Sequence, residues 1–238
     1  MKIYFDEAGR WPLFGPVYVW LVISFIPQQA LKKHLLFQDS KLLSPKKRLQ
    51  GYQEILELQE KKQILAAVGS ADNGWIDRYG LTRAIQIAIY KALYQLLCHL
   101  TGQKQGKNFT IKQLKNLIGD YENLANNEIE LILDGKSDFG ISKELGIKTQ
   151  TIVHGDRDCV VISMASILAK VSRDHLLDQY AKKYPGYGLE KHKGYWTKFH
   201  YQAIQELWIL PEHRKLFLKD FFPDRKIEKF APNQKILG

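Results

Sequence analysis

Four acidic residues of this chain are placed where they could hold divalent cations. Asp6 and Glu7 are adjacent and follow a short apolar run, and Asp134 and Asp156 each follow a later one. Two ionised carboxylates side by side repel each other, so a cation is the natural way to stabilise the pair. Carboxylate oxygens suit Mg²⁺ or Mn²⁺, and two such ions can hydrolyse a phosphodiester by activating a water and stabilising the leaving oxygen. Asp134 and Asp156 also adjoin glycines and taken singly would fit ordinary turns, but as a set with the first pair they favour a metal site.

The composition favours a soluble protein with an anionic partner. The chain has 238 residues, of which 45% are hydrophobic and 25% charged, and its formal net charge is +10. Nucleic acid is the commonest partner of such a basic chain, although solvated lysine faces would give the same balance. Cys98 and Cys159 show neither metal-type spacing nor a disulfide framework, which predicts a cytoplasmic protein. There is no signal-peptide pattern, and the longest apolar run, residues 17–26, is too short to cross a bilayer, so no membrane is expected.

The hydrophobic periodicity predicts strands and helices around these acids. Alternating or β-branched apolar runs predict strands, and the short turn between the first two favours an antiparallel pair. Ser44 followed by Pro45 is typical of a helix N-cap and first helical position. The predicted strands span residues 2–6, 17–25, 63–69, 129–133 and 148–153. The predicted helices span residues 45–58, 81–96, 161–180 and 197–207, with a short helix near 111–117 inside a polar insertion at 101–127.

This order of elements predicts a mixed α/β sheet flanked by helices. Asp6 and Glu7, and likewise Asp134 and Asp156, then fall at the carboxyl ends of strands. That edge of the sheet is where α/β proteins build their sites. We therefore expect the four carboxylates to share one cleft.

Short motifs surround the four acids in a fixed order. The opening motif is Asp6-Glu7-Ala8-Gly9-Arg10 with Pro12 and Gly15-Pro16. The later motifs are Asp39-Ser40-Lys41 with Leu43-Ser44, Ile76-Asp77 with Gly80-Leu81, Leu133-Asp134-Gly135, Gly155-Asp156 with the helix from Ser163 to Asp174, Tyr184-Pro185-Gly186-Tyr187-Gly188, Lys191-His192-Lys193-Gly194-Tyr195, and His213-Arg214. Together they resemble the type 2 ribonucleases H, the ribonuclease HII family, from residue 3 to about residue 217.

The resemblance implies a fold and an activity. The fold would be a ribonuclease H-like mixed sheet flanked by helices, with a C-terminal helical extension. Residues 1–183 would form the catalytic core, including the insertion near 101–127, and residues 184–238 a substrate loop and basic extension packed on it. The activity would be that of a divalent-metal-dependent endonuclease, expected as a monomer. It would hydrolyse the RNA strand of RNA–DNA hybrids and cut on the 5′ side of ribonucleotides embedded in duplex DNA, leaving 5′-phosphate ends.

The resemblance also implies roles for individual residues. The metal ligands and catalytic residues would be Asp6, Glu7, Asp134 and Asp156, holding two ions of Mg²⁺ or Mn²⁺. The substrate-binding residues would be Gly9, Arg10, Trp11, Lys41 and Tyr195. Residues 9–11 would approach the ribose 2′-hydroxyl, largely through backbone groups, and this hydroxyl distinguishes RNA from DNA. Tyr195 would pack at the ribonucleotide beside the scissile phosphate, and Lys41 could contact a phosphate.

Two tryptophans depart from the family pattern. Trp11 stands where the family usually has glycine, and Trp196 where a small residue is common. A turn that needs a positive φ at residue 11 would be strained by the larger side chain. Otherwise the indole could add a stacking surface, forming an aromatic patch with Tyr195 and Trp196, or could simply point outward.

Two other functions fit the same sequence. One is a catalytically impaired relative that binds hybrids or duplexes without cutting them, and the other is a different ribonuclease H-like nuclease such as a resolvase. Metal-dependent hydrolysis has no need of His192 or His200, so we expect both at the surface. Lys170, Arg173 and Asp174 share one helix, which predicts an ion pair within it.

Overall fold

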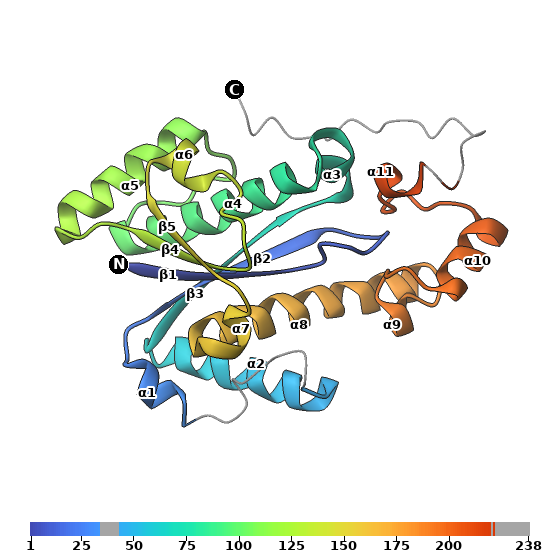
Figure 1. Cartoon of the computed structure of the whole chain (residues 1–238), viewed down its shortest axis with the longest axis horizontal. Coiled ribbons are helices and arrows are strands. Elements are labelled where there is room, and N and C mark those ends of the chain that lie inside the picture. Colours follow the sequence, from blue (N-terminus) through green and yellow to red (C-terminus); the bar gives the residue numbers. More distant parts are fainter. Residues whose placement is uncertain (34–42, 220, 222–238) are drawn as a thin grey trace.

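A five-stranded mixed sheet lies at the centre of the computed structural model, with the strand order β3-β2-β1-β4-β5 (Figure 1). The structure describes residues 1–33, 43–219 and 221. The strands are β1 (Lys2–Ala8), β2 (Val17–Ser24), β3 (Ile64–Ala71), β4 (Glu130–Asp134) and β5 (Lys148–Ile152). All five predicted strands are therefore present, and the predicted mixed sheet is confirmed.

The pairing of the strands brings the acidic segments to one edge. β1 pairs antiparallel with β2, as the short turn predicted, and β2 pairs antiparallel with β3. β1 is parallel to β4, and β4 is parallel to β5. Parallel strands end at the same edge of a sheet, so the residues at the carboxyl ends of β1, β4 and β5 meet there.

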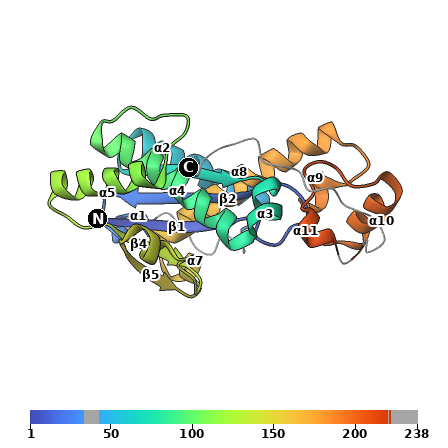
Figure 2. The same ribbon diagram turned by 90° about the horizontal axis from the view of Figure 1, so that it is seen from above.

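Helices cover both faces of the sheet, and a group of short helices lies beyond one end (Figure 2). One face carries α4 (Leu81–Thr101), with α3 (Asn73–Tyr79), α5 (Ile111–Ala125) and α6 (Ile141–Leu145) on that side. The other carries α8 (Val160–Lys183), with α1 (Gln28–Leu31), α2 (Pro45–Glu60) and α7 (Gly155–Asp158). The short helices beyond the end are α9 (Leu189–His192), α10 (Lys198–Leu207) and α11 (Lys215–Leu218).

Residue patterns explain the main helices. Ser44 caps α2 by accepting a hydrogen bond from the backbone N–H of Lys47 at 3.3 Å, as the Ser-Pro pair predicted. In α8 the small residues Ser163, Ala165 and Ser166 are buried, which lets the helix lie close to the sheet. Between α4 and β3 the approach is closer still, because a Cβ added at Gly69 would lie 1.9 Å from the carbonyl oxygen of Ala88. Glycine is therefore required at residue 69.

Three apolar clusters stabilise the fold. The first lies between the sheet and α4, where Phe5, Val19 and Leu93 are buried, and the second lies between the sheet and α8. The third joins the loop after β1 to the C-terminal helices, since Leu13 and Phe14 pack with residues of α8, α9, α10 and α11. Burial of such side chains contributes roughly 1.5–3 kcal/mol each. The loop that carries the first motif is thus packed on both sides.

Some elements differ from those that the periodicity predicts. The helix in the polar insertion spans Ile111–Ala125 rather than a short stretch near 111–117, because a Thr110–Gln113 capping box starts it and a buried stripe of Leu114, Leu117 and Ile118 continues it. The short helices α1, α3, α6 and α7 were not predicted, since helices of four to seven residues show too few turns for a periodic pattern. Within the described residues, no helix has both the length and the apolar character that crossing a membrane requires.

Candidate active site

Three of the four predicted carboxylates line one cavity at the carboxyl edge of the sheet. Asp6 and Glu7 lie near the end of β1, and Asp134 is the last residue of β4. The cavity has a volume of about 330 Å³. The described residues that line it are Asp6, Glu7, Ala8, Gly9, Arg10, Trp11, Arg48, Asp134, Ser166, Lys170 and Tyr195. The structure therefore brings together the first motif, the third acidic position and the late tyrosine.

Asp156 is buried and is not among the described residues that line the cavity. It sits in α7, just after β5, and only 1% of its surface is exposed. The backbone N–H of Gly155 donates to Oδ1 of Asp134 at 2.7 Å. This bond joins the start of α7 to the end of β4. Asp156 is the residue after Gly155, so the bond also fixes the backbone of Asp156 close to Asp134.

The surroundings of Asp6 disfavour its charged form. Burial raises the pKa of Asp6 well above its ordinary value, and the neighbouring charges of Glu7 and Asp134 raise it further. Hydrogen bonds from the Ser166 side chain and from the Glu7 backbone N–H, at 2.7 Å, act in the opposite direction. Arg10 pairs with Glu7 at 3.1 Å and compensates only part of the negative charge. A divalent cation bound here would relieve the remaining repulsion.

The donor set fits a hard divalent cation. Carboxylate oxygens from two adjacent strands face the same cavity, and neither His nor Cys is among the described residues that line it. In the part of the chain that the structure describes, no group of three or more His, Cys, Asp or Glu side chains is arranged closely enough to hold an ion. The chemistry of the residues thus suits Mg²⁺ or Mn²⁺, and closure of the carboxylates around an ion would be a movement of side chains.

Two positively charged side chains and one hydroxyl side chain that line this cavity were not predicted as site residues. Arg48 comes from α2, and Ser166 and Lys170 come from α8. Lys170 pairs with Asp174 at 2.8 Å, which confirms the predicted ion pair within the helix, and its Nζ lies 5.8 Å from the centroid of the Tyr195 ring. Burial lowers the pKa of Lys170. The helical spacing of Ser166 and Lys170, four residues apart, was the available signal for a shared face.

Most of the predicted substrate-binding residues line this cavity, and one lies outside the described part of the chain. Gly9, Arg10, Trp11 and Tyr195 all line the cavity, whereas Lys41 lies outside the described residues. Trp11 is 66% exposed and does not have a positive φ, so the larger side chain causes no backbone strain at this turn. Gly9 has φ +92°, and a Cβ there would lie 2.3 Å from Nε of Arg173. The turn therefore requires glycine at residue 9 and tolerates tryptophan at residue 11.

Two buried arginines hold the turn through backbone carbonyls. Arg214 donates to the carbonyl oxygens of Gly9 at 2.6 Å, Arg10 at 3.0 Å and Gly15 at 2.9 Å. Arg173 donates to those of Phe14 at 2.8 Å, Pro16 at 3.3 Å and Lys193 at 3.0 Å. The predicted role of Arg173 in an ion pair within its own helix is thus wrong, because its guanidinium points across to the turn.

A hydrogen-bonded chain of histidines supports the loop that carries Tyr195. His213 accepts from the backbone N–H of Leu210 at 2.8 Å through Nδ1, so its Nε2 carries the proton and donates to Nε2 of His200 at 3.1 Å. His200 then donates through Nδ1 to the carbonyl oxygen of Tyr195 at 3.0 Å. The predicted surface position is wrong for His200, which is fully buried, and only half right for His192, which is partly buried. Sequence periodicity cannot show such long-range pairing.

The histidine chain predicts loss of stability in mild acid. Burial lowers the pKa of His200 to about 4 and that of His213 to about 3, from an ordinary value of 6.5. Below pH 6.5 the unfolded chain takes up protons that the folded chain excludes, so the free energy of unfolding should fall as the pH decreases toward 4. We expect a loss on the order of 5 kcal/mol across this window, about half from each histidine. Urea denaturation between pH 7.5 and 4.5 measures it.

Two variants separate the buried histidines from other acid effects. His200→Gln should flatten the dependence of stability on pH, because it removes one of the two buried titrating groups. His99→Gln changes an exposed histidine and should keep the dependence of the unchanged protein. Identical slopes in all three proteins would contradict the assignment.

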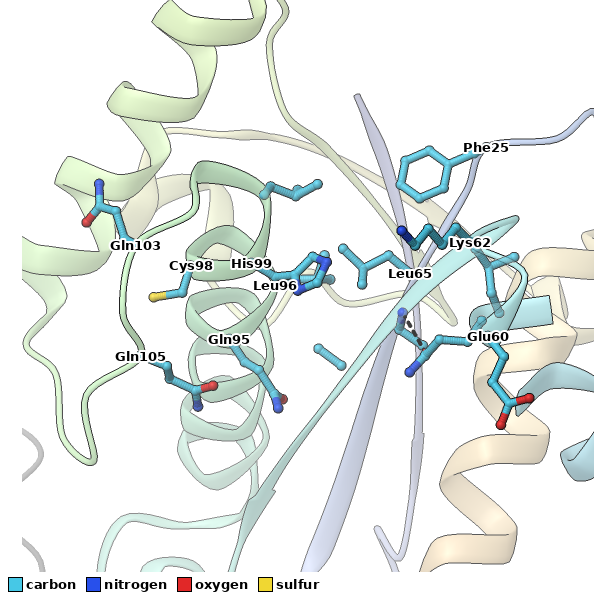
Figure 3. Close-up of a pocket in the computed structure, with 15 residues that line it drawn as sticks. Phe25, Glu60, Lys62, Leu65, Gln95, Leu96, Cys98, His99, Gln103 and Gln105 are labelled. Atoms are coloured by element: carbon cyan, nitrogen blue, oxygen red, sulfur yellow. Dashed lines mark hydrogen bonds between the residues drawn. The ribbon is translucent and has the colours of Figure 1, made fainter. Parts of the chain in front are cut away.

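A larger cavity lies at the opposite side of the sheet, and none of the predicted site residues that the structure describes lines it (Figure 3). Its volume is about 740 Å³, and it lies along the free edge of β3, between α2 and α4. Gln59 accepts a hydrogen bond from the N–H of Ala66 at 3.2 Å, and Gln95 from that of Val68 at 3.3 Å. Side chains of the flanking helices thus satisfy outward backbone groups of an edge strand, which is a structural role.

Comparisons with known proteins show which sequences and folds this chain is similar to. The family model described as Ribonuclease HII matches residues 3–222. The Ribonuclease HII of Coxiella burnetii (strain Dugway 5J108-111) is 35% identical over 232 residues, which cover 96% of this chain and 92% of the relative. The crystal structure of ribonuclease H2 from Pyrococcus horikoshii OT3 has a TM-score of 0.62 at 18% identity, covering 94% of this chain and 99% of that one. Bst-RNase HIII in complex with Mn²⁺ has a TM-score of 0.55 at 16% identity, covering 90% of this chain and 63% of that one.

Proposed function

The chain belongs to the ribonuclease HII family and is an endoribonuclease of ribonuclease H type 2, and we propose that it cuts on the 5′ side of ribonucleotides embedded in duplex DNA as well as in RNA–DNA hybrids. One observation carries the assignment of the reaction to a site. Asp6, Glu7 and Asp134 line the same cavity as the turn of residues 9–11 and Tyr195. Acids suited to a cation thus lie beside backbone groups suited to a ribose.

In the proposed reaction, water attacks the phosphorus and the bond to the preceding 3′-oxygen breaks. The products are a 3′-hydroxyl and a 5′-phosphate. Bound divalent cations would activate the water and stabilise the leaving oxygen. Asp6, Glu7 and Asp134 would hold the cations, and Asp156 would complete the ligand set. The raised pKa of Asp6, caused by burial and then by the charges of Glu7 and Asp134, supports this role.

The positive side chains of the cavity have a complementary role. Arg48 and Lys170 would face the phosphates of the cut strand, since both line the same cavity as the acids. Gly9, Arg10 and Trp11 would lie along the ribose, and Tyr195 would pack against the same nucleotide. The buried arginines keep this turn in place before the substrate arrives. Pre-organised polar groups need not reorient during the reaction.

We propose Mg²⁺ or Mn²⁺ as the cation, two ions being held at once. Oxygen-only ligation favours such hard cations, and the structurally similar Bst-RNase HIII has been solved with Mn²⁺. We also propose that residues 1–183 act as the catalytic core and residues 184–238 as a substrate-binding extension. The described part of that extension packs on the core through the third apolar cluster. A cytoplasmic monomer accords with two buried free cysteines, Cys98 and Cys159.

Cleavage of three labelled duplexes tests the proposal. They hold one ribonucleotide in DNA, a continuous RNA strand on DNA, and DNA alone. We expect Mg²⁺- or Mn²⁺-dependent cuts in the first two, with the cut on the 5′ side of the ribonucleotide, and none in DNA. Binding without cutting would support the impaired relative, and cutting of branched all-DNA junctions would support a resolvase.

A further inference from the structure

The lip of the active-site cavity carries an exposed aromatic surface built by residues of two loops. Trp11 is 66% exposed, Trp196 44% and Tyr195 38%. Trp11 and Tyr195 both line the cavity that holds the carboxylates. We refer to Trp11, Tyr195 and Trp196 as the aromatic lip. Large exposed aromatic side chains beside a polar site indicate a binding surface rather than a packing one.

Direct hydrogen bonds join the two loops that carry the aromatic lip. The indole N–H of Trp196 donates to the carbonyl oxygen of Trp11 at 2.8 Å. The backbone N–H of Leu13 donates to the carbonyl oxygen of Gly194 at 2.8 Å. Arg173 bridges the same loops by donating to the carbonyl oxygens of Phe14 and Lys193. The aromatic lip is therefore held in position before any ligand arrives.

Ring contacts fix the orientation of Trp196. Its ring packs edge-on against Tyr201, with centroids 5.8 Å apart, and against Phe221, with centroids 5.4 Å apart. The rings of Tyr201 and Phe221 also pack against each other, with centroids 4.7 Å apart. Trp196 thus has a supported side and an exposed side. Such pre-ordered aromatic side chains bind with a small loss of conformational entropy.

The backbone carbonyl of Trp11 already accepts a hydrogen bond within the protein, so a substrate would contact other groups of this residue. Trp196 donates to that oxygen, so the carbonyl already has a partner, while Trp11 as a whole remains 66% exposed and can offer its indole. An indole face recognises a flat ring, and the flat rings of a nucleic acid are its bases. Arg48 and Lys170 in the same cavity provide the charge complementarity that places the phosphate backbone alongside.

We propose that Trp11 of the aromatic lip, held by Trp196, stacks on a nucleobase next to the ribonucleotide at the cut site. This inference rests on the proposed function, because the carboxylates fix which phosphate lies in the cavity. The base face can become available in two ways. The lip can insert beside the base in a continuous duplex, or it can cover a base already exposed at a nick. Both routes lead to the same stacking contact. They differ in whether a nick beside the base changes the affinity of the protein for the duplex.

Binding without turnover tests the proposal. The protein is titrated in EDTA into duplexes that hold one ribonucleotide and either a 2-aminopurine or an abasic site at the adjacent position. We expect Trp11→Ala to weaken binding of the duplex with the base about 5- to 100-fold. It should leave binding of the abasic duplex nearly unchanged. The fluorescence of 2-aminopurine should change on binding to the unchanged protein and change less with Trp11→Ala.

Further variants separate stacking from structural damage. Trp11→Phe keeps a ring, so its affinity should lie between that of the unchanged protein and that of Trp11→Ala. Trp196→Phe should also have an intermediate affinity, because it keeps a ring but loses the hydrogen bond to the carbonyl of residue 11. Phe25→Ala removes a 55% exposed aromatic residue at the far side of the sheet and should bind as the unchanged protein does (Figure 3). Thermal melting confirms that each variant is folded.

A nick beside the ribonucleotide distinguishes the two sources of the base face. Tighter binding of the nicked duplex than of the continuous one, lost in Trp11→Ala, indicates a base that was already exposed, and equal binding indicates insertion. Equal weakening of base-containing and abasic duplexes by Trp11→Ala, or no weakening, would overturn the stacking proposal while cleavage by the unchanged protein upholds the proposed function. Failure of the unchanged protein to cut any ribonucleotide-containing duplex would overturn both.

Discussion

Asp134→Asn should reduce Mg²⁺-dependent cleavage on the order of 10³-fold and leave the metal-free protein at least as stable as before. The side chain keeps its shape, and its amide oxygen can still accept the hydrogen bond that Gly155 donates to Oδ1. Only the negative charge is lost. A ligated cation supplies several kcal/mol of transition-state stabilisation, and each 1.4 kcal/mol changes the rate about tenfold. Removal of one charge also relieves the repulsion that raises the pKa of Asp6.

Measurements of the cleavage rate and of the melting temperature together distinguish loss of a metal ligand from loss of the folded state. The cleavage rate is measured at saturating Mg²⁺, and the melting temperature is measured with and without Mg²⁺. The ion should raise the melting temperature of the unchanged protein more than that of the variant, because only tight binding to the folded state stabilises it. Asp158→Asn is the matched control, since Asp158 is an exposed acid two residues from Asp156. Full cleavage by Asp134→Asn would refute the proposed ligand set.

Local sequence patterns predicted the part of the site that depends on strand ends. Asp6, Glu7 and Asp134 each follow an apolar run, and runs of that kind form adjacent parallel strands here. The sheet edge then brings the acids together without further information. Asp156 follows the same rule, but it lies in the short helix after β5 and is not among the described residues that line the cavity.

Contacts between distant segments could not be predicted from periodicity. Arg48 reaches the cavity from α2, and the packing of α2 beside α8 decides where this side chain points. The pairing of His200 with His213 depends on how the chain turns after α10. Burial of a histidine or an arginine is against the average behaviour of these residues, so composition gives no signal for it.

Replacement of Arg214 is expected to cost stability and activity together. Arg214→Met preserves much of the side-chain volume but removes the donors to the carbonyl oxygens of Gly9, Arg10 and Gly15. Each buried carbonyl left without a partner costs about 1–3 kcal/mol, so we expect a loss of at least about 3 kcal/mol in the free energy of unfolding. Urea denaturation measures this loss. Cleavage should also fall, because the same carbonyls fix the turn that would face the ribose.

The charge of Arg214 is not what stabilises the turn, and a second variant can show this. Burial, and then the nearby charge of Arg173, lower the pKa of Arg214 to about 9, so its surroundings disfavour the cation. Arg214→Lys keeps a positive charge but loses the planar fork that reaches three carbonyls, so it should restore little of the lost stability. Arg78→Met, at an exposed position, should be nearly neutral. Recovery of stability and cleavage by Arg214→Lys would show that charge, rather than the three hydrogen bonds, holds the turn.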